Sequence, residues 1–322
     1  MNTQEHVYRC ALPQLGSKMF LADGGLETTL IFEEDWELPH FAAFVLLDSP
    51  SGSATLRRYY ERYIALALQY ATGMILESPT WRASPNWGAA TGYSDAELTT
   101  INQRAIAQLA KLRQTHATEK TPIVLSGCLG PEGDGYNPQR QLSVAQAREY
   151  HGLQTAAFAD TEADMLCAVT FTYAAEAIGA TLAARDADMP IAISFTVETD
   201  GHLPSGQSLE DAIAEVDIAT KGRPAYYMVN CAHPTHFLST LMPKGSWTRR
   251  IVGIRANAST LSHAELDEAT ELDAGDPQDF GRQYHTLRQL LPNLRILGGC
   301  CGTDHRHIEA AAQCALGTDL VA

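Results

Sequence analysis

The sequence is poor in positive charge and in cysteine. Its 322 residues hold 23 Lys and Arg against 38 Asp and Glu, a formal net charge of −15. A protein of that sign repels phosphate backbones and anionic lipids, which argues against nucleic-acid binding as its main function. Seven cysteines are too few for a secreted domain held together by disulfides. We therefore expect reduced thiols.

Long hydrophobic runs are lacking as well. The most apolar short run covers residues 41–47, and the next, residues 64–76, is broken by Gln69, Thr72 and Gly73. Neither approaches the roughly 18 apolar residues of a membrane-spanning helix. The first 17 residues show no basic segment followed by an apolar one, so no signal peptide is predicted. We expect a cytoplasmic protein with no membrane partner.

Short apolar segments alternate eight times with longer segments of helical period. Most of the short segments are continuously apolar, which is typical of parallel strands buried on both faces. The predicted strands are residues 19–22, 74–77, 122–126, 165–170, 191–195, 226–230, 251–255 and 295–297. The predicted helices are residues 54–71, 94–115, 143–161, 174–184, 208–220, 234–241, 279–291 and 304–316, with Ser143 and Ser208 as N-caps.

Eight strand-then-helix units without a dividing linker predict an α/β protein with a (β/α)8 TIM barrel as a single domain over residues 1–322. A doubly wound open sheet is the alternative, because strand order cannot be read from one sequence. That fold usually carries a Gly-rich phosphate-binding loop after its first strand. This sequence has Asp23-Gly24-Gly25-Leu26-Glu27 there, which favours the barrel.

Three cysteines lie at the C-terminal ends of predicted strands, where barrel enzymes place their active sites. Cys231 follows the sixth strand, and Cys300 and Cys301 follow the eighth. Three thiolates around one point are good Zn²⁺ ligands and leave a fourth position open for a substrate. Flanking glycines would let both adjacent sulfurs face one centre. The pair could instead form a redox-active disulfide, and spacing alone leaves both interpretations open.

The remaining cysteines and histidines carry simpler expectations. A lone cysteine is most often a small buried hydrophobic residue, a role that we assign to Cys10, Cys167 and Cys314. His305 and His307 look like a metal-binding pair. On a helix, however, positions i and i+2 diverge by about 200°, so joint ligation is not expected.

Several segments together carry a likeness to a known family. They are Leu21-Ala22-Asp23-Gly24-Gly25, Ser126-Gly127-Cys128-Leu129-Gly130-Pro131, Val229-Asn230-Cys231, Asn257-Ala258-Ser259 and Gly298-Gly299-Cys300-Cys301-Gly302-Thr303. In these segments the sequence resembles the homocysteine S-methyltransferase family, whose betaine- and S-methylmethionine-dependent members are zinc-containing (β/α)8 barrels. The likeness runs in the family's order from residue 19 to about residue 310.

The resemblance implies that Cys231, Cys300 and Cys301 bind Zn²⁺ and that the sulfur of homocysteine takes the fourth position as a thiolate. That thiolate would receive a methyl group from a sulfonium donor (S-methylmethionine or S-adenosylmethionine) or a betaine-type donor, giving methionine. Asp23 is the expected catalytic residue, because its carboxylate would hold the ammonium end of the acceptor. The expected substrate-binding residues are Asp23, Gly24, Gly25, Glu27, Thr170 and Asn257.

Two positions depart from the family pattern. Val169 stands where the family usually has a Glu that binds the amino group of homocysteine, and Glu27 stands where a small residue is usual. Glu27 either replaces the missing charge in space or is a solvated residue favoured by the dipole at a helix start. Residues expected to contact the cationic donor, from their positions at strand ends, are Glu77, Trp81, Glu132 and Tyr136.

Several functions therefore compete. The leading hypothesis is a zinc-dependent homocysteine S-methyltransferase with a small-molecule thiol acceptor and a cationic methyl donor, acting as a monomer or homodimer. The alternatives are a barrel that methylates a different thiol, a zinc hydrolase or lyase, and a zinc-binding barrel without methyltransferase activity. Three sulfur ligands argue against the hydrolase. The long C-terminal extension of betaine-using tetramers is lacking, so the resemblance favours sulfonium donors.

Overall fold

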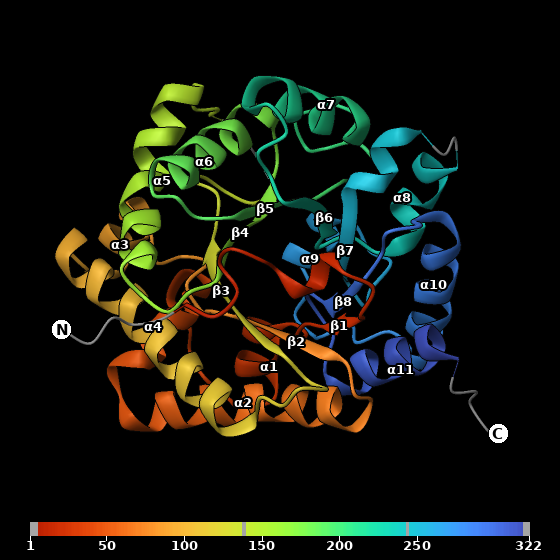
Figure 1. The fold of residues 1–322 in the computed structure, drawn as a ribbon, viewed down its shortest axis with the longest axis horizontal. Coiled ribbons are helices and arrows are strands. Elements are labelled where there is room, and N and C mark those ends of the chain that lie inside the picture. Colours follow the sequence, from red (N-terminus) through yellow and green to blue (C-terminus); the bar gives the residue numbers. More distant parts are fainter. Residues whose placement is uncertain (1–5, 137–139, 243–244, 318–322) are drawn as a thin grey trace.

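Eight parallel strands close into a barrel inside a ring of helices (Figure 1). The computed structural model describes residues 6–136, 140–242 and 245–317. The strands follow one another around the barrel in chain order, and β8 pairs with β1. The predicted (β/α)8 barrel is therefore confirmed, and the open doubly wound sheet is wrong. The predicted domain of residues 1–322 also includes residues 1–5, 137–139, 243–244 and 318–322, which lie outside the described residues.

The strands are buried along almost their whole length. They are β1 Phe20–Leu21, β2 Gly73–Glu77, β3 Ile123–Leu129, β4 Met165–Phe171, β5 Ile191–Phe195, β6 Tyr226–Asn230, β7 Ile251–Ala256 and β8 Ile296–Gly299. Each strand residue is buried except Arg255, which is partly exposed. Because helices cover one face of the barrel wall and the barrel interior covers the other, the strands have continuously apolar sequences.

The major helices pack around the outside of the barrel. The helices are α1 Leu26–Phe32, α2 Pro50–Gln69, α3 Pro85–Thr91, α4 Asp95–His116, α5 Val144–Ala159, α6 Ala174–Asp186, α7 Leu209–Thr220, α8 Pro234–Leu241, α9 His263–Asp267, α10 Pro277–Leu290 and α11 His305–Leu316. The predicted N-caps are confirmed, since Ser143 Oγ accepts from the N–H of Gln146 and Ser208 Oγ accepts from the N–H of Asp211. The sequence did not predict α1, α3 or α9, which are too short to show a helical period.

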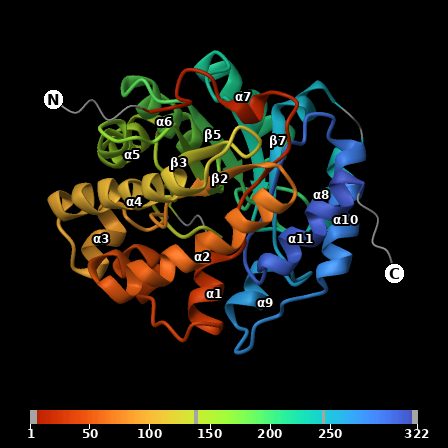
Figure 2. The ribbon, with the colours of Figure 1, turned by 60° about the horizontal axis from the view of Figure 1, so that its bottom comes forward.

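The N-terminal segment closes one end of the barrel. The N–H groups of Val7 and Tyr8 donate to one oxygen of Asp164 at 2.9 and 2.8 Å, and Arg113 donates to the other at 2.8 Å. Leu12 packs into the barrel interior. Figure 2 shows this segment at one end of the barrel and α1 and α9 at the other. The C-terminal ends of the strands therefore form the accessible end.

The lone cysteines differ in their burial. Cys167 is buried inside the barrel, as predicted, and Cys314 is partly buried. Cys10 is exposed, so its assignment as a buried hydrophobic residue is wrong. It lies in the irregular N-terminal segment, where backbone and arginine hydrogen bonds rather than apolar packing fix the chain. None of the helices in the three described ranges is long and apolar enough to cross a bilayer.

Candidate active site

The sulfur atoms of Cys231, Cys300 and Cys301 meet at the C-terminal end of the barrel. All three Sγ atoms lie within 4.8 Å of one another, and Cys231 Sγ is 3.5 Å from Cys301 Sγ. Among the described residues, no other group of three His, Cys, Asp or Glu side chains converges in this way. Three converging sulfurs match the donor set that Zn²⁺ prefers. The predicted ligands are thus brought together on one point.

An unusual backbone conformation aims Cys231 at this point. Its φ angle is 56°, in the left-handed region that residues other than glycine rarely adopt. The surrounding chain holds this conformation, because the N–H of Cys231 donates to the carbonyl of Arg255 at 3.0 Å and its carbonyl contacts Nε2 of His263 at 2.6 Å. Strain of this kind is kept where neighbouring contacts over-determine it, commonly at functional sites.

Glycines allow the loop that carries the other two cysteines to fold tightly. A side chain at Gly25 would place its Cβ 2.6 Å from the carbonyl oxygen of Cys300, so the loop after β1 packs directly on the cysteine loop. Gly302 has a φ of 77°, which only glycine adopts without strain. The expectation that flanking glycines let both sulfurs face one centre agrees with this geometry.

The three thiols share their protons unequally. Hydrogen bonds from Cys231 and Cys301 hold the pKa of Cys300 well below its usual value. The same contacts raise the pKa of Cys231 and Cys301. Thiolates rather than thiols bind metals. Cys300 is therefore ionised before its two neighbours.

Tyr136 and His263 cover the sulfur cluster. The hydroxyl of Tyr136 lies 2.9 Å from Cys231 Sγ, and the rings of Tyr136 and His263 are 4.4 Å apart between centroids. Burial raises the pKa of Tyr136 well above its usual value, so its hydroxyl stays protonated and can donate to the sulfur. His263, from α9, also contacts Glu198 through Nδ1 at 3.3 Å. The sequence predicted Tyr136 as a contact of the methyl donor, and its hydroxyl also contacts a cysteine.

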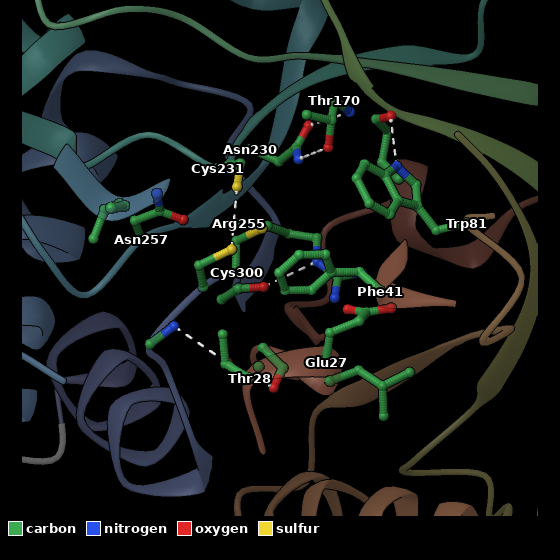
Figure 3. Close-up of a pocket in the computed structure, with 18 of the residues that line it drawn as sticks. Glu27, Thr28, Phe41, Trp81, Thr170, Asn230, Cys231, Arg255, Asn257 and Cys300 are labelled. Carbon is green, nitrogen blue, oxygen red and sulfur yellow. Dashed lines mark hydrogen bonds between the residues drawn. The ribbon is translucent and has the colours of Figure 1, made fainter. Parts of the chain in front are cut away.

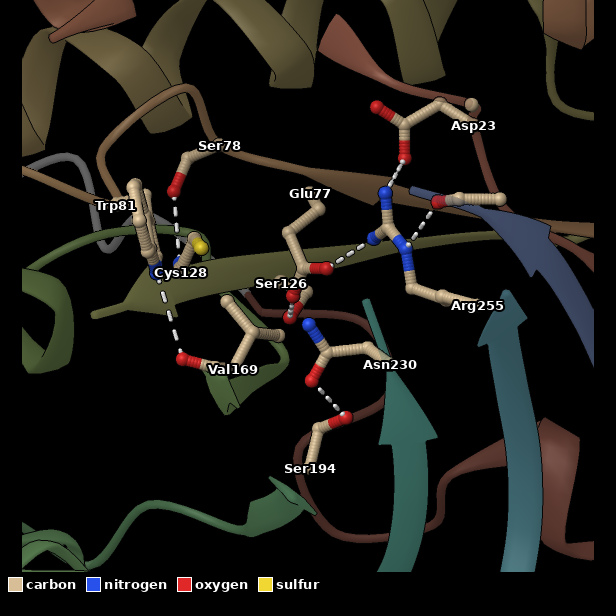
Figure 4. A network of polar contacts seen from close by, with 12 residues as sticks. Asp23, Glu77, Ser78, Trp81, Ser126, Cys128, Val169, Ser194, Asn230 and Arg255 are labelled. Atoms are coloured by element: carbon tan, nitrogen blue, oxygen red, sulfur yellow. Dashed lines mark hydrogen bonds and ion pairs between the residues drawn. The ribbon is translucent and has the colours of Figure 1, made fainter. Parts of the chain in front are cut away.

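An arginine whose side chain is 12% exposed joins two of the predicted acidic residues (Figure 4). Arg255 Nη2 donates to Asp23 Oδ1 at 2.6 Å, and Nη1 donates to Glu77 Oε2. The second oxygen of Asp23 accepts from Tyr59 at 3.0 Å, and that of Glu77 accepts from Ser126 at 3.1 Å. Burial raises the pKa of both carboxyls, and the charge of Arg255 offsets part of that shift. With both acids ionised, this Asp23–Arg255–Glu77 triad has an excess of one negative charge.

A cavity of about 360 Å³ opens above the sulfur cluster. Figure 3 shows Cys231 and Cys300 between Glu27 and Thr28 on one side and Thr170 and Asn230 on the other. All the predicted site residues line it, namely Asp23, Gly24, Gly25, Glu27, Thr170, Asn257, Cys231, Cys300 and Cys301. Val169, Glu77, Trp81 and Tyr136 line it too. Glu132 is not among the residues that line it, and its carboxylate accepts a hydrogen bond from Asn86.

Some of these residues already have protein partners. Thr170 has a φ of 62° and is held by Asn230, which accepts from the N–H of Thr170 at 2.9 Å and donates to its hydroxyl at 2.8 Å. The N–H of Gly25 donates to the carbonyl of Thr303 at 2.9 Å. Asn257 differs, because its buried Oδ1 has no hydrogen-bond partner in the described chain. Of these three residues, Asn257 is thus the one with an acceptor left for a ligand.

Comparison with known proteins decides the family. A model of the homocysteine S-methyltransferase family matches residues 20–315, nearly the whole chain. The chain belongs to this family. Its fold is also that of the Escherichia coli homocysteine methyltransferase MmuM. The metallated form of MmuM superposes with a TM-score of 0.70 at 20% identity over 92% of this chain and 96% of that chain. The oxidised form gives 0.70 at 21% identity over 92% and 95%.

The sequence did not reveal every functional side chain of this methyltransferase. Arg255 could have been noticed as the lone charge in the apolar strand β7. His263 gave no local signal, because its partners Cys231 and Glu198 come from other strand ends. His307 is fully buried, and its ring contacts Asp304 and the carbonyl of Ala274.

Glu27 of the methyltransferase should make its stability depend on pH. The residue lies half-buried in the first turn of α1, and burial raises its pKa from the ordinary 4.5 to about 7. The folded state binds the proton of the Glu27 carboxyl more tightly than the unfolded state does. The contribution of Glu27 to stability is therefore most favourable below pH 4.5 and falls as pH rises towards about 7. At pH 8, Glu27→Gln should therefore unfold at a higher urea concentration than the wild type, with a free energy of unfolding that is about 1–3 kcal/mol larger. At low pH the two proteins should unfold at the same urea concentration.

Glu265 provides the contrast for this experiment. It is exposed at α9, and hydrogen bonds from the hydroxyl and N–H of Ser262 lower its pKa. Its carboxylate therefore stabilises the fold above its ordinary pKa and stops doing so as pH falls. Glu265→Gln should lose stability at pH 8, the opposite of Glu27→Gln. Parallel pH profiles for the two variants would contradict the assigned environment of Glu27.

Proposed function

We propose that this chain is a zinc-dependent S-methyltransferase that moves a methyl group from a sulfonium or betaine-type donor to the thiol of homocysteine, giving methionine. The carrying observation is the convergence of three cysteine sulfurs within 4.8 Å of one another beneath a cavity of substrate size. Cys231, Cys300 and Cys301 would hold the zinc. When bound there, zinc would keep the sulfur of the acceptor in its thiolate form at neutral pH.

The other cavity residues would bind and orient the two substrates. The excess negative charge of the Asp23–Arg255–Glu77 triad attracts a cation, either the ammonium of the acceptor or the methyl-bearing centre of the donor. Asn257 offers its unpartnered oxygen to a donor group. Tyr136 and Trp81 limit access of water to the sulfur cluster. An in-line transfer of the methyl group needs few further catalytic groups, because positioning of the reacting groups supplies much of the rate enhancement.

A donor screen tests the proposal. Zinc-loaded protein is mixed with homocysteine and, separately, S-methylmethionine, S-adenosylmethionine, betaine and a simple dimethylsulfonium compound, and methionine is measured. We expect the highest rate with a sulfonium donor. Zinc binding with no methionine from any donor would contradict the proposal and favour the zinc-binding barrel without methyltransferase activity. Hydrolysis of the donor without methylation would favour the hydrolase.

Val169 leads to a prediction about the acceptor. It is buried, and lines the cavity at the position where the family resemblance places a glutamate. A hydrogen bond to a charged group contributes about 1.5–3 kcal/mol, so Val169→Glu should lower the KM for homocysteine roughly 10- to 100-fold. Val169→Gln, which has the shape without the charge, should change the KM far less. Steady-state kinetics with both variants measures the difference.

The opposite outcome also has a meaning. Suppose that Val169→Glu weakens the binding of homocysteine, and that the wild-type protein methylates a mercapto acid without an amino group faster than homocysteine. The cavity would then be built for a different thiol, and methionine would not be its product.

A further inference from the structure

Arg82 is a buried cation whose guanidinium has few hydrogen-bond partners among the described residues. The residue is 5% exposed, and its Nη1 donates to the carbonyl of Gly133 at 3.2 Å. Its Nε has no hydrogen-bond partner among the described residues. Burial lowers the pKa of Arg82 to about 10, which leaves it charged at neutral pH, and the nearby charge of Asp134 counteracts part of that shift. Burying an N–H group of a charged side chain without a partner is costly.

Two tryptophans fix the plane of this guanidinium. The Cζ atom of Arg82 lies 3.9 Å from the ring centroid of Trp81 and 3.5 Å from that of Trp87. The indole N–H groups are tied in turn, Trp81 to the carbonyl of Val169 and Trp87 to the carbonyl of Pro131, both at 3.4 Å. With two indole rings packed against Cζ, the guanidinium can receive a ligand through its N–H edge. A planar N–H edge held in one orientation suits a carboxylate.

Arg82 lines the same cavity as the sulfur cluster. The other arginine of the cavity, Arg255, already has Asp23, Glu77 and the carbonyl of Gly299 as partners. The cavity therefore contains one cation with an unpartnered N–H group and, with both acids ionised, one triad with an excess negative charge. A zwitterionic ligand, with a carboxylate at Arg82 and an ammonium or sulfonium group towards the triad, matches both.

We propose that Arg82 binds the carboxylate of a substrate in this cavity. The inference rests on the proposed function, because it assumes that the cavity takes a thiol acceptor and a methyl donor. Either substrate can carry the carboxylate. Arg82 is thus a specificity-determining residue that selects substrates bearing an acid, and it takes no part in the transfer of the methyl group.

The experiment compares substrates that differ only in the carboxylate. The acceptor arm uses homocysteine and 3-mercaptopropylamine, and the donor arm uses S-methylmethionine and (3-aminopropyl)dimethylsulfonium. Arg82→Met should raise the KM for the carboxylate-bearing member of one arm about 10- to 100-fold, with kcat changed less than about threefold. The member without the carboxylate should keep its KM. The arm in which the difference occurs identifies the substrate that Arg82 binds.

Two controls separate recognition from folding. Arg250→Met removes an arginine that is paired with Asp217 outside the cavity and should change no KM. Arg82→Lys keeps the charge without the planar fork and should recover part of the lost affinity. Equal losses for substrates with and without a carboxylate, or no change in any KM, would show that Arg82 only packs between the tryptophans and would overturn the inference.

Binding without turnover keeps the inference apart from the proposed function. Calorimetry measures methionine and its decarboxylated analogue, 3-(methylthio)propylamine, on wild type and on Arg82→Met. Suppose that no donor supports methylation, but Arg82→Met still weakens the binding of methionine and not that of its decarboxylated analogue. The proposed function then fails and the inference stands. If the wild type binds the decarboxylated analogue as tightly as methionine, the inference fails.

Discussion

Replacing Cys301 with serine should reduce bound zinc from about one ion per chain to less than a tenth of that, and methyl transfer at least about 100-fold. The loss should exceed the 10- to 100-fold cost of removing a residue that only supports a metal ligand, because a sulfur donor itself disappears. Elemental analysis of the purified variant gives the zinc content, and methionine formation gives the activity. Cys231→Ser should behave alike, since its Sγ lies 3.5 Å from that of Cys301.

Cys10→Ser and Cys314→Ser are the matched controls. Cys10 is exposed and Cys314 is partly buried beside Gly281, both away from the sulfur cluster, so each variant should retain zinc and activity. Thermal unfolding of Cys301→Ser should remain cooperative, because a core of this size does not depend on a metal. Full zinc occupancy in both Cys231→Ser and Cys301→Ser would refute the assigned ligand set.

The second large effect is expected from Arg255→Met, which should reduce the free energy of unfolding by about 3–5 kcal/mol at neutral pH. The substitution leaves the carboxylates of Asp23 and Glu77 buried without the cation that they share. Their pKa values should rise in the folded variant, so its deficit should grow as pH rises above about 4 and shrink in acid. Urea unfolding across that pH range measures both the size and the slope.

Arg250→Met removes a similar ion pair that is more exposed to solvent. Arg250 and Asp217 have side chains that are 31% and 27% exposed, so losing this pair should cost about 1 kcal/mol or less. Adding Asp23→Asn and Glu77→Gln to Arg255→Met should recover much of the stability, since no buried charge is then left unpaired. Equal losses for Arg255→Met and Arg250→Met would contradict the buried triad.

The fold and the sulfur cluster were predictable from sequence for the same reason. Parallel strands that are buried on both faces have continuous apolar runs, and a barrel places whatever follows each run at one end. Cys231, Cys300 and Cys301 directly follow such runs, so their convergence follows from the topology.

The network around the cluster was not predictable in this way. Arg255 lies on β7, but its carboxylate partners come from β1 and β2, which no local pattern links to it. His263 lies in a five-residue helix that is too short for a helical period. Such contacts are set by tertiary packing rather than by local sequence.

The pairing of β1 with β8 has a consequence for how the enzyme folds during its synthesis on the ribosome. Leu21 pairs with Leu297, so the two residues of this pair are separated by 276 positions (297 minus 21). At a translation rate of about 5–20 residues per second, β8 is synthesised roughly 15–60 seconds after β1. Cys300 and Cys301 emerge just after β8. A nascent chain therefore cannot bring Cys231, Cys300 and Cys301 together while its first seven strands fold, and a product truncated before β8 lacks both the closed barrel and two of these three cysteines.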